Sequence, residues 1–213
     1  GVQTCALPIF CEAYGLSETS PAASSNPVTS KVFTGSIGVP LPSTEMKIID
    51  DEGNEVPVGT PGEIAIRGPQ VMAGYWQRPD ETARVMTADG FFKSGDVGVM
   101  DERGYFRIVD RKKDMLKTGG ENVASREVEE MFYRLPAVSE VAVIGLPDPK
   151  WVEAVTAVIV LKAGQALTEA EVLAHCNQHM ASFKVPKRVV FADSLPKNPS
   201  GKLLKRELRT LYA

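Results

Sequence analysis

The sequence predicts an α+β protein whose first half is rich in β-strands and whose second half alternates helices with strands. Up to about Asp110, short apolar runs are separated by Gly and Pro residues. Beyond the charge cluster Asp110–Asp114 (DRKKD), helix-start signals alternate with apolar runs. Because periodicity and turn residues both change at this cluster, we expect two domains, residues 10–110 and residues 111–213.

Several segments of the first half have strand character. Glu63–Arg67 (EIAIR) alternates between polar and apolar residues, which is the pattern of a half-buried strand. Asp101–Gly104 (DERG) contains the residue types of a tight turn and predicts a hairpin. The further strands that we expect lie at Glu45–Ile49, Phe91–Phe92 and Tyr105–Val109.

The second half contains signals for three helices. Thr168 and Glu171 form a capping-box pattern and predict a helix that ends near Met180. Ser125 is expected to cap a helix that ends near Leu135. We expect a terminal helix over residues 203–211 and strands over residues 138–144, 154–161 and 187–191.

The composition excludes several classes of protein. Hydrophobic residues make up 43% and charged residues 24%, which indicates a globular chain. A net charge of −3 argues against a basic surface, so no nucleic-acid partner is expected. Three cysteines without a CxxC pair favour a reducing, cytoplasmic location. The longest apolar stretch, around residues 154–161, is too short to span a bilayer. Any membrane association would be peripheral, at the inner face, and no feature argues for it.

The first nine residues, GVQTCALPI, differ in character from the rest of the chain. They lack strand and helix periodicity, and they have no basic segment of the kind that opens a signal peptide. They resemble the translation of a common sequencing adapter. We therefore expect residues 1–9 to be non-native and the native reading frame to begin upstream, the alternative being a native segment.

Two short motifs of the first half suit a nucleotide. In YGLSE, the hydroxyl of Ser17 and the carboxylate of Glu18 could hold a phosphate and its Mg²⁺, and Tyr14 could stack on a base. In SGD, the carboxylate of Asp96 offers two acceptor oxygens for the adjacent hydroxyls of a ribose. Taken alone, each motif also fits an ordinary loop or turn.

Two motifs of the second half suit a mobile ligand channel. Gly119 and Gly120 follow the charge cluster and permit close backbone approach, although a charge run is also typical of a solvated surface. Lys202 lies in the loop PKNPSGK, which is not a P-loop because Leu203 replaces the required Ser or Thr. A lysine on such a loop could stabilise charge that develops on a phosphate.

One pattern in the second half suggests a metal but favours packing. His175 and His179 lie one helical turn apart, with Cys176 between them. The pair lacks the glutamate of an HExxH motif and a third ligand nearby in the sequence. We therefore expect a surface or packing role for these residues.

In this order and spacing, the four motifs resemble the later core motifs of the AMP-forming adenylating superfamily, which includes acyl-CoA ligases, luciferases and nonribosomal-peptide adenylation domains. The resemblance extends from about residue 11 to residue 213. Residues 36–82 and 105–123 look most like bacterial long-chain fatty acyl-CoA ligases. The resemblance implies the β-rich C-terminal subdomain of a large adenylating domain, followed by a small α+β C-terminal lid domain.

The resemblance also implies a reaction in two halves. ATP activates a fatty acid as acyl-AMP, with Mg²⁺ present, and CoA then displaces AMP. The implied ATP- and AMP-binding residues are Tyr14, Gly15, Ser17, Asp96 and Arg111, and Glu18 is the implied Mg²⁺-associated carboxylate. Lys202 is the implied catalytic lysine, which bridges the attacking carboxylate and the α-phosphate.

The implied hinge and CoA path lie in the second half. Lys113 matches the position about which the small domain rotates between the half-reactions. The residues implied to contact CoA are Gly119, Gly120, Trp151, Phe183 and Lys187. Trp151 could equally be an ordinary packing residue.

The superfamily's upstream phosphate-binding loop and most of the acyl pocket are not in this sequence. We therefore expect the chain to be a fragment that is inactive alone and exposes apolar surface. Acyl chain length and oligomeric state stay open. The alternatives are a ligase for another acyl or aryl acid and a non-catalytic, truncated nucleotide- or CoA-binding module.

Overall fold

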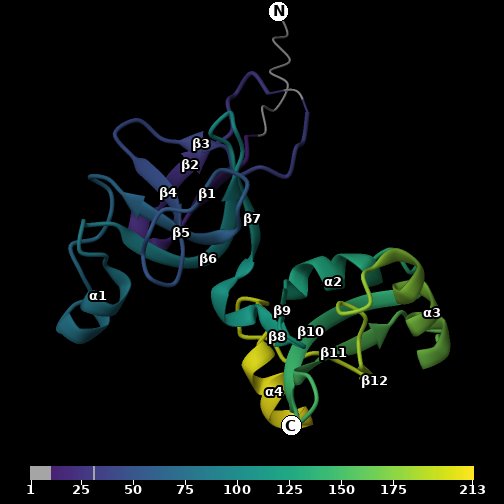
Figure 1. Ribbon diagram of the computed structural model, residues 1–213. Coiled ribbons are helices and arrows are strands. Elements are labelled where there is room, and N and C mark those ends of the chain that lie inside the picture. The colour runs from purple at the N-terminus through teal and green to yellow at the C-terminus, as the bar shows by residue number, and fades with distance from the viewer. Residues whose placement is uncertain (1–10, 31) are drawn as a thin grey trace, which may run out of the picture. The chain divides into compact units, whose positions relative to one another are not determined.

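The computed structural model describes residues 11–30 and 32–213, so the prediction for residues 1–9 lies outside the described part (Figure 1). The chain divides into two compact units between Lys112 and Lys113. Each unit is described by itself below. Mixed sheets and helices confirm the predicted α+β class.

The first unit contains two antiparallel sheets. The three-stranded sheet has the order β1-β2-β3 and the four-stranded sheet the order β4-β5-β6-β7. The strands are β1 (Ala13–Gly15), β2 (Ala22–Ser25), β3 (Val39–Pro40), β4 (Glu45–Ile49), β5 (Gly62–Arg67), β6 (Phe92–Met100) and β7 (Phe106–Arg111). The helical elements are η1 (Ser17–Thr19), α1 (Pro79–Val85) and η2 (Lys112–Asp114), the last of which begins at the unit boundary.

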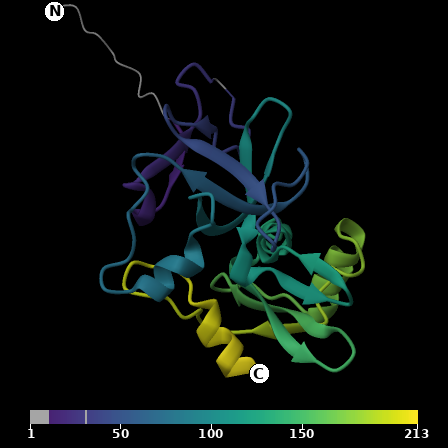
Figure 2. The ribbon, with the colours of Figure 1, turned by 60° about the vertical axis from the view of Figure 1, so that its left-hand side comes forward.

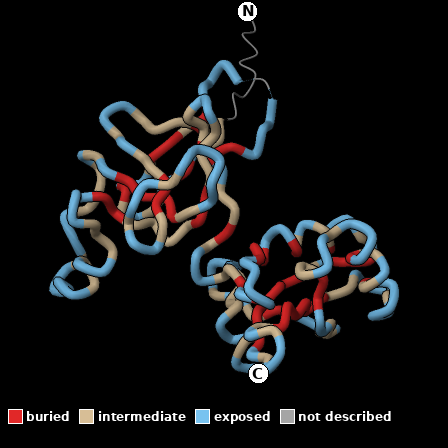
Figure 3. Tube along the Cα trace, in the orientation of Figure 1, coloured by how far each residue is buried: buried red, intermediate tan, exposed pale blue. Residues whose placement is uncertain are grey.

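The side chains of β5 point alternately to two faces, and this alternation explains the core of the unit. Ile64 and Ile66 point to one face, where they pack with Phe106 and Tyr14. Ala65 points to the other face and packs with residues of β4 and with Phe91. Figure 3 shows this buried path along the strands, with exposed loops around it. Period-two patterning therefore fixes which side chains of β5 face which core.

The second unit is built on a sheet whose two longest strands form a hairpin. The strands are β8 (Leu116–Thr118), β9 (Glu121–Val123), β10 (Val138–Asp148), β11 (Val152–Leu161) and β12 (Arg188–Phe191). β11 pairs antiparallel with β10 and β8, and parallel with β12. The helices are α2 (Ser125–Phe132), α3 (Glu169–His179) and α4 (Lys205–Tyr212) (Figure 2).

Helices cover both faces of this sheet. On one face, Val141 and Val143 of β10 pack with side chains of α2 and α3. On the other face, Ala142 and Ile144 pack with Leu208 of α4. Since both faces are covered, the central strands read as continuous apolar runs rather than alternating ones. No helix within the described residues combines the length and the apolar character needed to cross a bilayer.

The structure confirms one predicted cap and corrects another. Thr168 Oγ1 accepts a hydrogen bond from the Glu171 amide, and the Glu171 carboxylate accepts one from the Thr168 amide, as the capping box requires. Ser125 is not the cap of α2: the N-cap is Ala124, whose side chain makes no capping bond, and Ser125 is the first helical residue. Its hydroxyl instead accepts a bond from Lys205 at 2.6 Å, a long-range contact that local sequence does not reveal.

Other boundaries also differ from the predictions: for example, β10 ends at Asp148, four residues later than expected. The strand expected at Phe91–Phe92 runs from Phe92 to Met100, so the SGD motif lies inside β6 rather than in a loop. The helix starting at Ser125 ends at Phe132, three residues earlier than expected. The predicted hairpin turn after Met100 is confirmed: Asp101 accepts hydrogen bonds from the amides of Arg103 and Tyr105.

Candidate functional site

Three predicted site residues come together in the first unit. Tyr14 of β1 donates a hydrogen bond from its hydroxyl to Asp96 Oδ2 at 2.7 Å. Arg111 Nε lies 3.9 Å from Asp96 Oδ1. Asp96 and Arg111 are direct partners across β6 and β7. Strand pairing thus joins Asp96 and Arg111, and a side-chain hydrogen bond joins them to Tyr14, 82 residues before Asp96.

Burial determines the state of the Tyr14 hydroxyl. The residue is only 9% exposed and is part of the apolar core of the unit. Burial raises the pKa of Tyr14 far above its ordinary value, and the hydrogen bond to Asp96 acts in the same direction. Tyr14 therefore stays a neutral donor at physiological pH.

Gly15 is required by packing, whatever ligand binds beside it. A Cβ added there would lie 1.6 Å from the carbonyl oxygen of Pro21 and 2.7 Å from the Cα of Ala22. The neighbours are backbone atoms, which cannot move aside cheaply. The close approach of β1 and the Pro21 segment thus accounts for a glycine at this position.

Ser17 and Glu18 lie on the short helix η1. Ser17 is exposed and Glu18 is half-buried. Tyr75 donates a hydrogen bond to Glu18 Oε1 at 2.9 Å, and burial together with Glu18 raises the pKa of Tyr75. The Met72 amide donates to the Glu18 carbonyl at 2.8 Å, so the loop that contains Tyr75 is attached to η1 at two points. Sequence reasoning missed Tyr75, because no local pattern links it to Glu18.

Sequence reasoning also missed a carboxylate beside Asp96. Glu63 Oε1 accepts a hydrogen bond from the Gly95 amide, and its Oε2 accepts one from Lys112 Nζ, both at 2.9 Å. Lys112 also pairs with Asp51 at 2.7 Å. Partial burial lowers the pKa of Lys112, but the hydrogen bonds to Asp51 and Glu63 outweigh it and leave that pKa raised.

In the second unit, two of the predicted CoA residues, Gly119 and Lys187, lie beside the indole ring of a third, Trp151. Gly119 and Gly120 form the turn between β8 and β9, with φ of +58° and +87°. The Gly119 amide donates to the Trp151 carbonyl at 2.8 Å, and a Cβ on Gly119 would lie 3.1 Å from the indole. Lys187 Nζ lies 5.0 Å from the ring centre of Trp151.

The fifth predicted CoA residue, Phe183, is half-buried and packs against the core formed with α2 and α3. Lys150 is a cation that the predictions did not include, and its Nζ lies 4.8 Å from the centre of the Trp151 ring. Two ammonium groups therefore lie within about 5 Å of one aromatic ring, within the range of cation–π attraction. An anion with an aromatic base would fit such a cluster.

Lys202 lies on an ordered loop with an exposed side chain. Asn198 Oδ1 accepts from the Lys202 amide at 2.8 Å, and the Asn198 amide donates to the Lys202 carbonyl at 2.9 Å. Among the described residues, the ammonium group makes no hydrogen bond or ion pair. Lys113, the predicted hinge, is also exposed and is the first residue of the second unit.

The histidine pattern has a packing role in the structure. His175 Nε2 lies 3.2 Å from the Met131 carbonyl, and His179 Nδ1 lies 2.8 Å from the His175 carbonyl. Cys176 is fully buried, and burial raises the pKa of its thiol to about 11. Within the described ranges, no group of three or more His, Cys, Asp or Glu residues could hold a metal ion.

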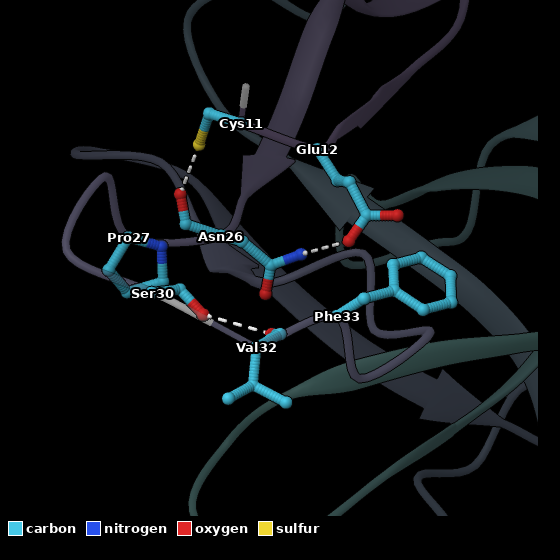
Figure 4. A pocket seen from close by; sticks show the side chains of 7 residues that line it. All are labelled: Cys11, Glu12, Asn26, Pro27, Ser30, Val32 and Phe33. Atoms are coloured by element: carbon cyan, nitrogen blue, oxygen red, sulfur yellow. Dashed lines mark hydrogen bonds between the residues drawn. The ribbon is translucent and has the colours of Figure 1, made fainter. Parts of the chain in front are cut away.

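A separate hollow of about 230 Å³ lies in the first unit, and none of the predicted site residues lines it (Figure 4). Cys11 Sγ donates to the Asn26 carbonyl at 2.6 Å, and the Asn26 amide donates to Glu12 at 3.5 Å. Val32 and Phe33, on the loop beside it, are 72% and 78% exposed. The polar residues Cys11, Glu12 and Asn26 that line this hollow thus form hydrogen bonds with one another.

Two family models match the chain, in the order that the motifs predict. Residues 2–76 match the AMP-binding enzyme family, and residues 127–202 match the AMP-binding enzyme C-terminal domain. The range between them contains Asp96 and Arg111.

Named relatives extend the match over nearly the whole chain. A long-chain-fatty-acid–CoA ligase of Escherichia coli O6:H1 is 49% identical over 93% of this chain. A feruloyl-CoA synthase of an Amycolatopsis species is 45% identical over 95% of it. ATP-bound MatB from Rhodopseudomonas palustris superposes with a TM-score of 0.89 at 42% identity, covering 95% of this chain.

The chain spans 35%, 41% and 40% of the lengths of these three proteins, respectively. The two domain matches and these relatives agree with one another and with the α+β fold. The chain therefore belongs to the AMP-binding, adenylate-forming enzyme family, to which acyl-CoA ligases belong.

Proposed function

We propose that the chain is part of a ligase that activates a fatty acid with ATP and transfers the acyl group to CoA. The observation that carries the proposal is the cluster of Tyr14, Asp96 and Arg111. Asp96 provides carboxylate oxygens for the two ribose hydroxyls, and Arg111 provides a donor beside them. Its neighbour Tyr14 fixes Asp96 through the 2.7 Å hydrogen bond, and we assign its ring to adenine on the resemblance alone.

The reaction that we propose has two steps. A carboxylate oxygen attacks the α-phosphorus of ATP, and the bond to the β-phosphate oxygen breaks, which gives acyl-AMP and pyrophosphate. The CoA thiolate then attacks the acyl carbon, and the bond to the AMP oxygen breaks. Lys202 orients the carboxylate and the α-phosphate in the first step and stabilises their charge.

Glu18 and Ser17 fit a magnesium ion that arrives with a nucleotide. Mg²⁺ is commonly held by one or two carboxylates together with substrate phosphates, so a single carboxylate is an adequate donor set. Tyr75 donates to Glu18 Oε1, which leaves Oε2 for the ion, and Ser17 is exposed. When bound, Mg²⁺ would neutralise charge on the phosphates.

The second unit is proposed to act in the thioester step. Gly119 and Lys187 lie beside the indole ring of Trp151, and Gly120 follows Gly119 in the same turn, which supports a contact with CoA. We assign Phe183 to the same surface on the resemblance alone. Lys113 lies at the boundary of the two units, which supports its role as the hinge.

For the acid substrate there are two candidates, a fatty acid and an aryl acid. A fatty acid is favoured by the long-chain-fatty-acid–CoA ligase at 49% identity, and an aryl acid by the feruloyl-CoA synthase at 45%. The two identities differ little, and the described site residues bind nucleotide and CoA rather than the acid. The upstream segment of the enzyme should therefore determine which acid reacts.

A chimera tests the function directly. The 213-residue chain would replace the matching C-terminal segment of the Escherichia coli ligase, and fatty-acid-dependent ATP–pyrophosphate exchange and acyl-CoA formation would be measured. We expect both activities with palmitate. A folded chimera that binds ATP but makes no acyl-CoA would contradict the proposal. The same chimera built on the feruloyl-CoA synthase tests whether the acid follows the upstream segment.

The chain alone provides a complementary prediction. The purified 213-residue chain should show no fatty-acid-dependent ATP–pyrophosphate exchange, because most of the acyl pocket is formed by segments outside it. The measurement is exchange of labelled pyrophosphate into ATP, with the chimera as the positive control. Exchange by the chain alone at a rate near that of the chimera would refute this expectation.

A further inference from the structure

The SGD motif forms a bulge in the sheet of the first unit. β5 and β6 pair at Glu63 with Val97 and at Ala65 with Lys93. Three residues of β6 therefore stand opposite the single residue Ile64 of β5. A bulge of this kind changes the direction of a side chain on the bulged strand. Here the bulge in β6 directs Asp96 toward Tyr14 and Arg111.

A buried carboxylate replaces the missing ladder partner of this bulge. Gly95, at the centre of the bulge, has φ of +75°, and its amide donates to Glu63 Oε1 at 2.9 Å. Glu63 is only 8% exposed, so the bond is shielded from water. Charge-assisted hydrogen bonds to a buried carboxylate are stronger than neutral ones, and losing one leaves the amide without its partner.

The second oxygen of the same carboxylate holds the neighbouring strand end. Lys112 Nζ donates to Glu63 Oε2 at 2.9 Å and also pairs with Asp51. Lys112 directly follows Arg111, just as Gly95 directly precedes Asp96. One carboxylate therefore binds the chain neighbours of both residues that we assign to the ribose.

We propose that Glu63 is a positioning residue for the ribose-binding pair. It holds Gly95 and Lys112, and through them it fixes the position of Asp96 relative to Arg111. The inference rests on the proposed nucleotide site. It adds a specific expectation, namely that nucleotide affinity depends on a carboxylate that does not itself contact the nucleotide.

The test combines amide NMR with AMP titration of the 213-residue chain. In Glu63→Ala, the Gly95 amide should lose its hydrogen-bonded chemical shift, and AMP affinity should fall about tenfold. Glu63→Gln retains an acceptor for the Gly95 amide but loses the ion pair with Lys112. That variant should keep the Gly95 shift and recover most of the affinity.

Two control variants separate positioning from general stability. Glu45→Ala removes an exposed carboxylate that pairs with Arg67 on the same sheet, and it should leave AMP affinity unchanged. Ile64→Val weakens the core beside the bulge, and it should lower the melting temperature without changing AMP affinity. An affinity loss in Ile64→Val equal to that in Glu63→Ala would assign the effect to stability and overturn the proposal.

The remaining outcomes distinguish this inference from the proposed function. If the wild-type chain binds AMP and Glu63→Ala binds it equally well, the positioning role is wrong and the nucleotide site stands. If the wild-type chain does not bind AMP, the nucleotide site is contradicted, and with it the role of Glu63.

Discussion

The two units prepare their proposed site residues in opposite ways. In the first unit, Tyr14, Asp96 and Arg111 are held by hydrogen bonds, strand pairing and burial before any ligand arrives. In the second unit, Lys202 has a fixed backbone but an exposed side chain. Groups that bind a ligand in its ground state gain from being organised in advance, because little freedom is lost on binding. We propose that Lys202 acts in the first half-reaction only, so its side chain must be able to leave the site before the second.

This contrast makes Lys202 the residue whose loss should have the largest effect. In the chimera, Lys202→Ala should lower ATP–pyrophosphate exchange by on the order of a hundredfold or more, because charge stabilisation in the transition state is lost. Thioester formation from supplied acyl-AMP should be largely preserved. The matched control is Lys197→Ala on the same loop, where only an ion pair with Glu140 is removed. Equal loss of both half-reactions in Lys202→Ala would refute the separate role.

In the first unit, the strand that contains Tyr14 depends on a close backbone contact at Gly15. Gly15→Ala should lower the free energy of unfolding of the first unit by on the order of 3 kcal/mol, because its Cβ would collide with Pro21. Urea denaturation followed by circular dichroism measures this. Gly53→Ala, where an added Cβ meets nothing within 4 Å, should cost about 1 kcal/mol through its positive φ alone. Similar losses in both variants would show that the close contact relaxes.

Tyr14→Phe sharpens the comparison by removing one hydrogen bond while keeping the ring. The free energy of unfolding should fall by about 1 kcal/mol, the usual net contribution of such a bond. AMP affinity of the 213-residue chain should fall a few-fold, since Asp96 loses the donor that orients it. Tyr133→Phe, at an exposed position of the second unit, serves as the control. AMP affinity that is unchanged in Tyr14→Phe would separate the hydroxyl from nucleotide binding.

The smallest effect concerns the core of the second unit at high pH. Burial raises the pKa of the Cys176 thiol from 9.0 to about 11. The folded state therefore holds this proton more tightly than the unfolded state, so the contribution to stability is full below pH 9 and is lost as pH rises toward 11. Cys176→Ala should flatten the decline in melting temperature over this range. An identical decline in both proteins would contradict the assignment.

Local signals in the sequence predicted much of the fold. Thr168 and Glu171 located the start of α3, because a capping box is complete within four residues. Ser125 was wrong as a cap because its hydroxyl is used by Lys205, eighty residues later. β8 and β9 were not predicted, since their Gly119–Gly120 turn was interpreted only as a ligand contact. α1 was not predicted either: it is short, and none of its residues is buried.

The motifs predicted the residues of the proposed site but not the contacts that hold those residues in place. Asp96 and Arg111 could be named from short motifs, yet their pairing depends on the register of β6 and β7. Glu63 and Tyr75 act through contacts that span 32 and 57 residues. No sequence period marks such contacts, because they arise only when the sheet and its loops are assembled.

The turn at Gly119 has a consequence for reading variation among related genes. Its amide is bonded to the Trp151 carbonyl, its φ is positive, and its Cα faces the indole. A library randomised at this codon and selected only for folding should return mostly glycine. An invariant glycine here would thus be expected even in a lineage that had lost the proposed contact with CoA. Lys150 and Lys187, whose ammonium groups face the same ring from exposed positions, are free of that constraint. In a lineage that had lost the activity, substitutions at these two lysines would therefore appear before any substitution at Gly119.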